Sequence, residues 1–450
     1  MTRANLVKRL EWGKVNRMKI AVIGSGISGL VAAYRLSSHH EITIFEANSY
    51  VGGHTNTVEV DLEGERHTID TGFIVFNDRT YPNFVKLLDE LGVASDPTSM
   101  SFSVSCDATG LEYNGTNFNG LFAQRSNLFR PRFYRLLRDI MRFNREAPEL
   151  LAANCLETLT VSEYLQQHDY SRQFVDQYLL PMGSAIWSCP PETFEQFPMR
   201  FIVEFYQNHG LLSLTNRPTW RVIRGGSYQY VKAMTRSFRE NIRLRCPVQS
   251  VRRLADSVEL IHSGGQTEQY DEVIFACHAD QALRILQDKS PLEEHLLGAF
   301  PYSHSIAVLH TDRSVLPKRR RAWASWNYHL HRGRSQEATV TYNMNILQHI
   351  ESQYDFCVTL NDNDRIDPDR VIRRIAYSHP IFTTQRKLAQ QRHGRLIRRN
   401  RTSFCGAYWG NGFHEDGVNS ALAVCRQFEE TPIVIPKTNT SSPAAIQEAV

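Results

Sequence analysis

The sequence predicts a mixed fold, α/β in type and α+β overall, with a parallel-sheet domain and a second domain of antiparallel strands and helices. Three observations support this prediction. Residues 18–46 form a strand, a glycine-rich turn, a helix and a second strand, which is a β-α-β unit. Two later blocks, at about 224–286 and 404–428, contain similar buried strands. The segments between them differ, because one is helical and aromatic-rich and the other alternates apolar and polar residues, as half-exposed antiparallel strands do.

Each element follows from a local pattern. MKIAVI and EITIF are short continuous apolar runs, typical of parallel strands buried on both faces, and LVAAYRLSS between them has helical spacing. The second block predicts a glycine pair, a helix, two paired strands and the buried strand DEVIFA. The third block, which begins FCGAYWGNGF, predicts a strand, a glycine-rich loop and a closing helix.

The blocks imply that the chain leaves the first domain and returns to it twice. The expected boundaries are a flexible extension at 1–17; a nucleotide-binding domain at 18–95, 221–298 and 396–430; a substrate domain at 96–220 and 299–395; and a disordered tail at 431–450.

Composition narrows the class of protein. A net charge of +4 is too small for a nucleic-acid binder, so no nucleic-acid partner is expected. The eight cysteines stand singly, with neither disulfide nor zinc spacing, so we expect buried thiols, no metal and a reducing, cytoplasmic compartment. No apolar run reaches the roughly 18 residues that span a bilayer.

Gly24-Ser25-Gly26-Ile27-Ser28-Gly29 is a G-x-G-x-x-G turn between the first strand and its helix. Gly24 makes the tight turn, Gly26 lets the backbone approach a pyrophosphate, and Gly29 lets helix and strand pack closely. The helix N-terminus offers free N–H groups to the phosphates. Glu46, 22 residues after Gly24, ends the next strand and is placed to accept the ribose hydroxyls. The motif therefore predicts a Rossmann-type site for a dinucleotide.

A second glycine pair favours FAD over NAD. Gly52-Gly53-His54-Thr55 begins six residues after Glu46 and would bring further backbone N–H groups to the phosphates. An NAD-binding fold has no need of such a pair at this place.

Five stretches of the chain resemble the flavin amine oxidoreductase superfamily, which includes amine oxidases, protoporphyrinogen oxidase and phytoene-type desaturases. They are IDTGFIVFNDRTYPNF, AIWSCPP, PTWRVIRGGSYQYVKAM, RAWASWNYH and FCGAYWGNGFHEDGVNSA. The resemblance extends from Met18 to about Phe428. It is closest to a bacterial NAD/FAD-binding branch, some members of which are associated with fatty-acid modification.

The resemblance implies further FAD contacts. His54 stands where most of the superfamily has arginine, and Ala407 where it often has glutamate, so both contacts are weakened. The remaining implied contacts are Ala47 and Asn48 at the adenosine; Thr71, Gly72, Phe73 and Ile74 at the flavin ring; Val248 and Ala276 at the adenine and ADP; and Gly406, Glu415, Asp416, Gly417 and Val418 in the final loop and closing helix. No linkage motif is recognisable, so the FAD is expected to be non-covalent.

The expected reaction is hydride abstraction, of desaturase or oxidase type, from a hydrophobic, lipid-like substrate such as a fatty acyl chain. Amine oxidases of the superfamily carry a lysine on a substrate-domain strand, and the best match for that strand, HSIAVLHTD, has none. Tyr408 and Trp409 are candidate catalytic walls, with Trp187 as a third. His278, His310 and His414 are weaker candidates for a base, since a lone histidine is more often structural. A flavin amine oxidase and a non-redox flavin isomerase or mutase remain alternatives.

The segment 127–146 predicts a basic amphipathic helix. Its apolar side would carry residues such as Phe133, Met141 and Phe143, while Arg135 and Arg138 project elsewhere. Such a helix either packs inward as a surface helix or lies on an anionic membrane, and KRRRAW at 318–323 adds charge. Peripheral contact with the inner membrane surface and a phospholipid acyl substrate are therefore expectations of the sequence.

Overall fold

The computed structural model describes residues 17–187, 189–213, 217–331, 339–360, 364–383 and 385–430. The predicted tail and all of the predicted extension except Arg17 lie outside these residues.

A five-stranded parallel sheet forms the centre of the first domain. Its strands lie in the order β10 (Ile242–Arg243), β2 (Glu41–Phe45), β1 (Lys19–Ile23), β14 (Glu272–Phe275) and β20 (Thr402–Phe404). In β1, Ile20 and Val22 enter one core while Ala21 and Ile23 enter another on the opposite face. Both faces are covered, which is why the strand is a continuous apolar run. The predicted parallel sheet is thus confirmed.

Helices and a small sheet cover the two faces. One face carries α1 (Ile27–Leu36), α2 (Pro82–Leu91), α10 (Tyr228–Thr235) and α15 (His414–Glu430). The other carries the antiparallel strands β11 (Val248–Arg253), β12 (Val258–His262) and β13 (Gln266–Tyr270), with α11 (Ala279–Ile285), α12 (Pro291–Leu297) and α14 (Arg386–Gln390). Helices α1 and α15 contact each other, so the two ends of the nucleotide-binding domain meet in one layer.

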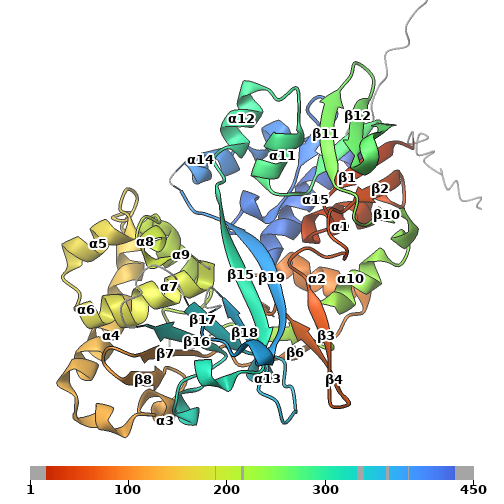
Figure 1. Cartoon of the computed structure of the whole chain (residues 1–450). Coiled ribbons are helices and arrows are strands. Elements are labelled where there is room, and N and C mark those ends of the chain that lie inside the picture. Colours follow the sequence, from red (N-terminus) through yellow and green to blue (C-terminus); the bar gives the residue numbers. More distant parts are fainter. Residues whose placement is uncertain are drawn as a thin grey trace, which may run out of the picture.

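A seven-stranded sheet forms the second domain, in the order β19 (Val371–Pro380), β15 (Tyr302–His310), β18 (Cys357–Leu360), β17 (Thr339–Asn343), β16 (Trp326–Leu330), β7 (Phe102–Cys106) and β8 (Leu111–Asn114). All neighbours are antiparallel except β16 and β7. Figure 1 shows the long strands β15 and β19 running between the two lobes of the molecule.

Helices pack beside the β7–β8 end of this sheet in an aromatic-rich core. They are α4 (Pro131–Ala152), α5 (Val161–His168), α6 (Arg172–Phe174), α7 (Leu180–Trp187), α8 (Pro191–Phe194) and α9 (Met199–Asn208). Short elements complete the fold: α3 (Phe118–Leu121), α13 (Met344–Leu347), the hairpin β3 (Thr57–Leu62) and β4 (Glu65–Asp70), and a small sheet of β5 (Phe76–Asn77), β9 (Trp220–Ile223) and β6 (Ser95–Pro97).

The strands of the parallel sheet come from 18–95, 221–298 and 396–430, and those of the larger sheet from 96–220 and 299–395. Three elements depart from these limits, and the first is strand β6, which spans Ser95–Pro97. Strand β9 begins at Trp220, and Ala389 of α14 packs in the core beside the parallel sheet. None of the helices described is long and apolar enough to cross a bilayer.

Candidate active site

A cavity of about 770 Å³ is lined by both domains. We call the part formed by 23–28, 45–48, Tyr50, 52–54, 247–248, 276–278, Gln281 and 284–285 the glycine end. The opposite part, the aromatic end, is formed by Met100, Ser101, Phe102, Met182, Ile186, Trp187, Phe205, His209, Leu211, Trp220, Trp326, Tyr342 and Phe382. Between them lies a middle part formed by 72–75, 376–380, 406–408 and 411–414.

The three glycines of the first turn have three different environments. A Cβ added at Gly24, whose φ is +106°, would lie 2.7 Å from the carbonyl oxygen of Ala276. A Cβ at Gly29 would lie 2.0 Å from the carbonyl oxygen of Gly24. A Cβ at Gly26 would meet no atom within 4 Å, because this residue faces the cavity. Gly24 and Gly29 therefore hold the turn against the sheet and helix, and Gly26 leaves room for a ligand.

Glu46 is buried beneath this turn, with only 5% of its surface exposed. Its Oε2 accepts hydrogen bonds from the Ser25 backbone N–H at 2.9 Å and from the Ser25 hydroxyl at 2.6 Å. Its Oε1 accepts from the Asn48 N–H at 2.8 Å. The carboxylate thus also ties the glycine turn to the loop after β2, a role the sequence did not suggest.

The second glycine pair packs directly on the first turn. The Gly52 N–H donates to the Ser25 carbonyl oxygen at 3.0 Å, and a Cβ at Gly53 would lie 3.1 Å from the Gly26 Cα. His54 follows and lines the cavity, stacked on Tyr377 with ring centroids 4.9 Å apart. Burial holds the pKa of His54 well below its usual range, so its imidazole is neutral near pH 7.

Two side chains of α14 form hydrogen bonds that hold the loop after β20. The Arg386 guanidinium donates to the carbonyl oxygens of Tyr408 at 3.1 Å and Gly410 at 2.7 Å. Gln390, one turn later, donates to the same two oxygens at 3.0 and 2.6 Å. The Asp416 carboxylate accepts from the Phe413 N–H at 2.9 Å. This buried clamp fixes the loop that forms the middle of the cavity.

Helix α15 begins at His414, at the cavity wall. The His414 ring stacks on Phe73 with centroids 3.5 Å apart, and its Nε2 lies 2.9 Å from Thr55 Oγ1 and 3.2 Å from the Tyr230 hydroxyl. Burial lowers the pKa of His414 to about 3. His414 is therefore a neutral structural residue, rather than a base poised near pH 7.

The aromatic end contains no Asp, Glu, Lys or Arg side chain among the described lining residues. Glu46 and Arg284, the charged residues of the described lining, both belong to the glycine end. Trp187 sits within a cluster of rings that includes Phe194, Phe205 and Phe382. The aromatic end is therefore an apolar chamber, which suits an uncharged part of a substrate.

Most residues predicted to bind FAD line this cavity. They are Gly24, Ser25, Gly26, Ile27, Ser28, Glu46, Ala47, Asn48, Gly52, Gly53, His54, Gly72, Phe73, Ile74, Val248, Ala276 and Gly406, and the candidate wall residue Tyr408 joins them.

The remaining predicted residues do not line the cavity. They are Gly29, Thr55, Thr71, Glu415, Asp416, Gly417, Val418 and Trp409. Several of them support residues that do. Glu415 accepts from the Phe84 N–H at 2.9 Å, and Trp409 stacks on His393 with centroids 4.3 Å apart. At the start of α15 it is residues 411–414, immediately before the predicted contacts, that reach the cavity.

Other wall residues were missed from the sequence. Phe413 and His379 line the middle, and Phe102 and Trp326 line the aromatic end from neighbouring strands more than 200 residues apart in the chain. His310 lies on β15 away from the cavity, where its Nε2 is 2.8 Å from Thr359 Oγ1. No lysine in the described part of the chain lines the cavity.

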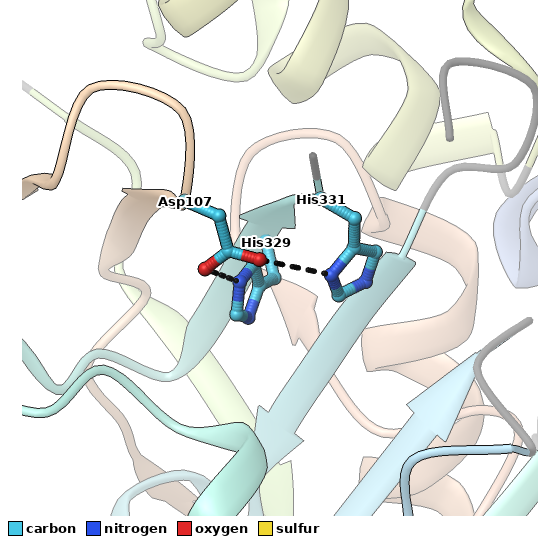
Figure 2. A group of neighbouring side chains, drawn as sticks. All are labelled: Asp107, His329 and His331. Carbon is cyan, nitrogen blue, oxygen red and sulfur yellow. Dashed lines mark hydrogen bonds and ion pairs between the residues drawn. The ribbon is translucent and has the colours of Figure 1, made fainter. Parts of the chain in front are cut away.

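A separate cluster of Asp107, His329 and His331 lies where β7 and β16 end (Figure 2). The Asp107 carboxylate lies 2.9 Å from His329 Nε2 and 3.8 Å from His331 Nδ1. The carboxylate oxygen and the ring nitrogens that could bind a metal ion all lie within 4.8 Å of one another. However, Arg365 Nη1 also lies 3.5 Å from the Asp107 carboxylate. A guanidinium at this distance opposes a second cation, so we assign the cluster to a network of hydrogen bonds and an Arg365–Asp107 ion pair that joins the strand ends.

Comparison with solved structures gives several similar folds at low sequence identity. Putrescine oxidase bound to putrescine aligns with a TM-score of 0.64 and 13% identity over 92% of this chain and 99% of that one. Cyclohexylamine oxidase from Brevibacterium oxydans gives 0.64 and 15% over 92% and 100%. A CLA-producing fatty acid isomerase from P. acnes gives 0.63 and 13% over 91% and 98%. At these identities the likeness shows the fold alone.

Sequence comparison adds a short match and a long one. The 4,4'-diapophytoene desaturase of Staphylococcus aureus is 58% identical over 45 residues, which is 10% of this chain and 9% of that protein. The model of the family described as flavin containing amine oxidoreductase matches residues 27–354. The chain therefore belongs to the flavin containing amine oxidoreductase family and is an FAD-dependent oxidoreductase.

Proposed function

We propose that this oxidoreductase removes hydride from a hydrophobic, lipid-like substrate, a fatty acyl chain, and that its FAD is bound non-covalently. The observation that supports this best is the aromatic end of the cavity, where the described lining carries no charged side chain.

The residues of the glycine end fit FAD. The open space at Gly26 and the adjoining Gly53 leave backbone N–H groups facing the position a pyrophosphate would take. Glu46 would receive the ribose, and Val248 lines the wall beyond it, toward the adenine. Residues 411–414 would bring the N-terminus of α15 to the flavin ring, where its dipole favours negative charge. When bound, FAD supplies the acceptor for a hydride.

The chain contributes positioning rather than acid–base chemistry. The cavity histidines are held neutral: burial lowers the pKa of His209 and His379 to about 4 and that of His414 to about 3. Phe205, Trp187 and Phe413 would hold an acyl chain and exclude water beside the middle of the cavity. A dry, well-oriented C–H is the main requirement of hydride removal, and effective molarity supplies much of the acceleration.

Non-covalent binding is supported by the cysteines. Cys277 belongs to the lining, and burial raises its pKa to about 12, so it is not a reactive thiolate. All eight cysteines are free, which also favours a reducing, cytoplasmic compartment.

An amine substrate is less well supported. Two of the similar folds are amine oxidases, but an ammonium group would need a carboxylate or an equivalent partner, and the aromatic end offers none among the described lining residues. A fatty acid isomerase is the second candidate, because one such enzyme shares the fold. It would return the hydride to the same chain and need no external acceptor.

Anaerobic mixing of the purified yellow protein with substrates tests the proposal. Long-chain acyl lipids should bleach the flavin absorbance, and putrescine should not. Product analysis without an acceptor separates the isomerase, which would give a shifted double bond with the flavin still oxidised. Bleaching by small amines alone would overturn the proposal. Heat release followed by chromatography should give free FAD, and flavin retained on the denatured chain would exclude non-covalent binding.

A further inference from the structure

Exposed apolar side chains gather at one corner of the molecule. Of eight large hydrophobic residues with high exposure in the described chain, five lie between 118 and 141: Phe118 (68%), Leu128 (36%), Phe129 (85%), Tyr134 (48%) and Met141 (61%). Contacts link several of them, because Phe122 packs against both Phe118 and Tyr134, and the Tyr134 hydroxyl donates to the Leu128 carbonyl oxygen at 3.0 Å. We call this surface the apolar corner. It corrects one expectation, since Met141 faces outward and not into the core.

Positive charge surrounds the apolar corner. Residues 112–139 contain five arginines and two acidic residues, which are buried: Glu112 pairs with Arg319 at 2.9 Å, and Asp139 lies 3.7 Å from Arg138. The second basic segment, Lys318–Arg321, lies beside them, because its 3-10 turn contacts α3 and β8. Thus two basic stretches that are far apart in sequence meet around exposed apolar side chains. In Figure 1, α3 and α4 lie at the end of the molecule away from the parallel sheet.

A second hollow, of about 500 Å³, lies between this corner and the cavity. Arg125 and Arg321 line it together with the polar residues Asn117 and Asn119. Ser101 lines both this hollow and the aromatic end of the cavity. A polar, basic hollow next to an apolar chamber matches a lipid with an anionic headgroup and an acyl chain.

We propose that the apolar corner docks on an anionic bilayer and that the hollow of Arg125 and Arg321 binds the anionic headgroup of the lipid whose chain enters the cavity. The proposal rests on the proposed acyl substrate. Phe129 and Phe118 would enter the interface while the arginines pair with headgroups, the combination that holds amphipathic surfaces on membranes. The hollow would orient the lipid with its chain toward Ser101 and the aromatic end.

Co-sedimentation of the FAD-loaded protein with vesicles tests the docking without requiring turnover. Binding should be strong to phosphatidylcholine vesicles containing phosphatidylglycerol, weak to phosphatidylcholine alone, and reduced by salt. Phe129→Ser should lower partitioning about tenfold, and Arg135→Gln about fivefold. Leu388→Ser, at a 63% exposed site in the other domain, and Arg66→Gln are matched controls that should change nothing.

Soluble lipid separates the hollow from the bilayer surface. Monomeric short-chain phosphatidylglycerol should bind about tenfold more weakly to Arg125→Gln/Arg321→Gln, and equally well to Phe129→Ser. An unchanged affinity in the double variant would overturn the headgroup site. Equal binding to neutral and anionic vesicles would overturn the membrane surface. It would also be overturned, in favour of a contact with a second copy, if Phe129→Ser lost self-association but kept its binding to vesicles. If vesicles bind but acyl lipids neither bleach the flavin nor gain a shifted double bond, docking stands and the proposed substrate fails.

Discussion

The two ends of the cavity are built in opposite ways. The glycine end is built around backbone: Gly24, Gly26 and Gly29 follow one another in a single turn, and the Glu46 carboxylate lies below it. The aromatic end is made from side chains on separate elements, such as Phe102 on β7, Trp326 on β16 and Phe205 on α9. A turn that binds a ligand through its backbone tolerates few residue types, so it leaves a recognisable motif in the sequence. An apolar wall can be built from many residue types on separate elements, so it leaves no such motif.

The sharpest test of this contrast is a pair of Gly→Ala variants within the glycine turn. Gly29→Ala should destabilise the protein by at least about 3 kcal/mol, because the new Cβ would lie 2.0 Å from a backbone oxygen that cannot move aside. Gly26→Ala should leave the fold intact, since its φ of −68° suits alanine and its Cβ meets no atom within 4 Å, but flavin should be lost. Thermal unfolding and flavin content measure the two effects, with Gly115→Ala as a control in open space. Equal behaviour of the two variants would contradict the assigned roles.

Acid should destabilise the protein through the neutral histidines of the cavity, since His209, His379 and His414 line the middle and the aromatic end and His54 lines the glycine end. With His393, four buried histidines have pKa values of about 3 to 4, below the usual 6.5. As the pH falls, these histidines become protonated in the unfolded state before they do so in the folded state. The stability that they contribute is therefore fully present above pH 6.5 and is lost at lower pH. Burial raises the pKa of Asp70 and Asp416 to about 6, which acts in the opposite sense between pH 4 and 6. Four histidines minus two carboxyls leaves two more protons bound by the unfolded state, so the free energy of unfolding should fall by up to about 3 kcal/mol per pH unit.

Urea unfolding between pH 7 and pH 5 measures this loss. Asp70→Asn should steepen it by removing one of the opposing groups. Stability that rises on acidification would show that the carboxyls dominate.

Glu46→Gln should weaken FAD retention by about 1.5–3 kcal/mol, because a charge-assisted contact to the ribose is lost. The structure adds a second effect. The NH₂ group of a glutamine, itself a donor, would face the N–H donor of Ser25 or of Asn48. The free energy of unfolding of the FAD-free protein should therefore also fall by about 1 kcal/mol. Flavin titration and unfolding of the FAD-free variant separate the two. Unchanged flavin affinity would remove Glu46 from the ribose site.

The smallest effect is expected from Trp187→Phe. The Trp187 Nε1 is buried and has no hydrogen-bond partner among the described residues. Replacing it with another ring should therefore cost less than about 1.5 kcal/mol, whereas Trp187→Ala should cost about 3–5 kcal/mol. A large cost for Trp187→Phe, measured by urea unfolding, would indicate a polar role in the aromatic end.

These differences explain how far sequence reasoning could reach. The turn at Gly24–Gly29, Glu46 and the parallel sheet were predictable because their causes are local in the chain. Val248 and Ala276 could be placed only through resemblance to a family, since neither residue type indicates a nucleotide. Arg386 was missed because an arginine ordinarily predicts a surface position, and its burial depends on carbonyl groups presented by the Tyr408–Gly410 loop. Phe102 and Trp326 meet only when β7 pairs with β16, which no local pattern encodes.

The central claim is that one cavity joins a flavin site to an apolar chamber for an acyl chain. The most direct measurement is the affinity of the FAD-loaded protein for a series of acyl lipids of increasing chain length, followed by perturbation of the flavin spectrum. The account predicts that affinity rises by about 0.8 kcal/mol for each added CH₂, close to fourfold, until the aromatic end is filled. An affinity independent of chain length, or one that increases only with a positive charge on the ligand, would contradict it.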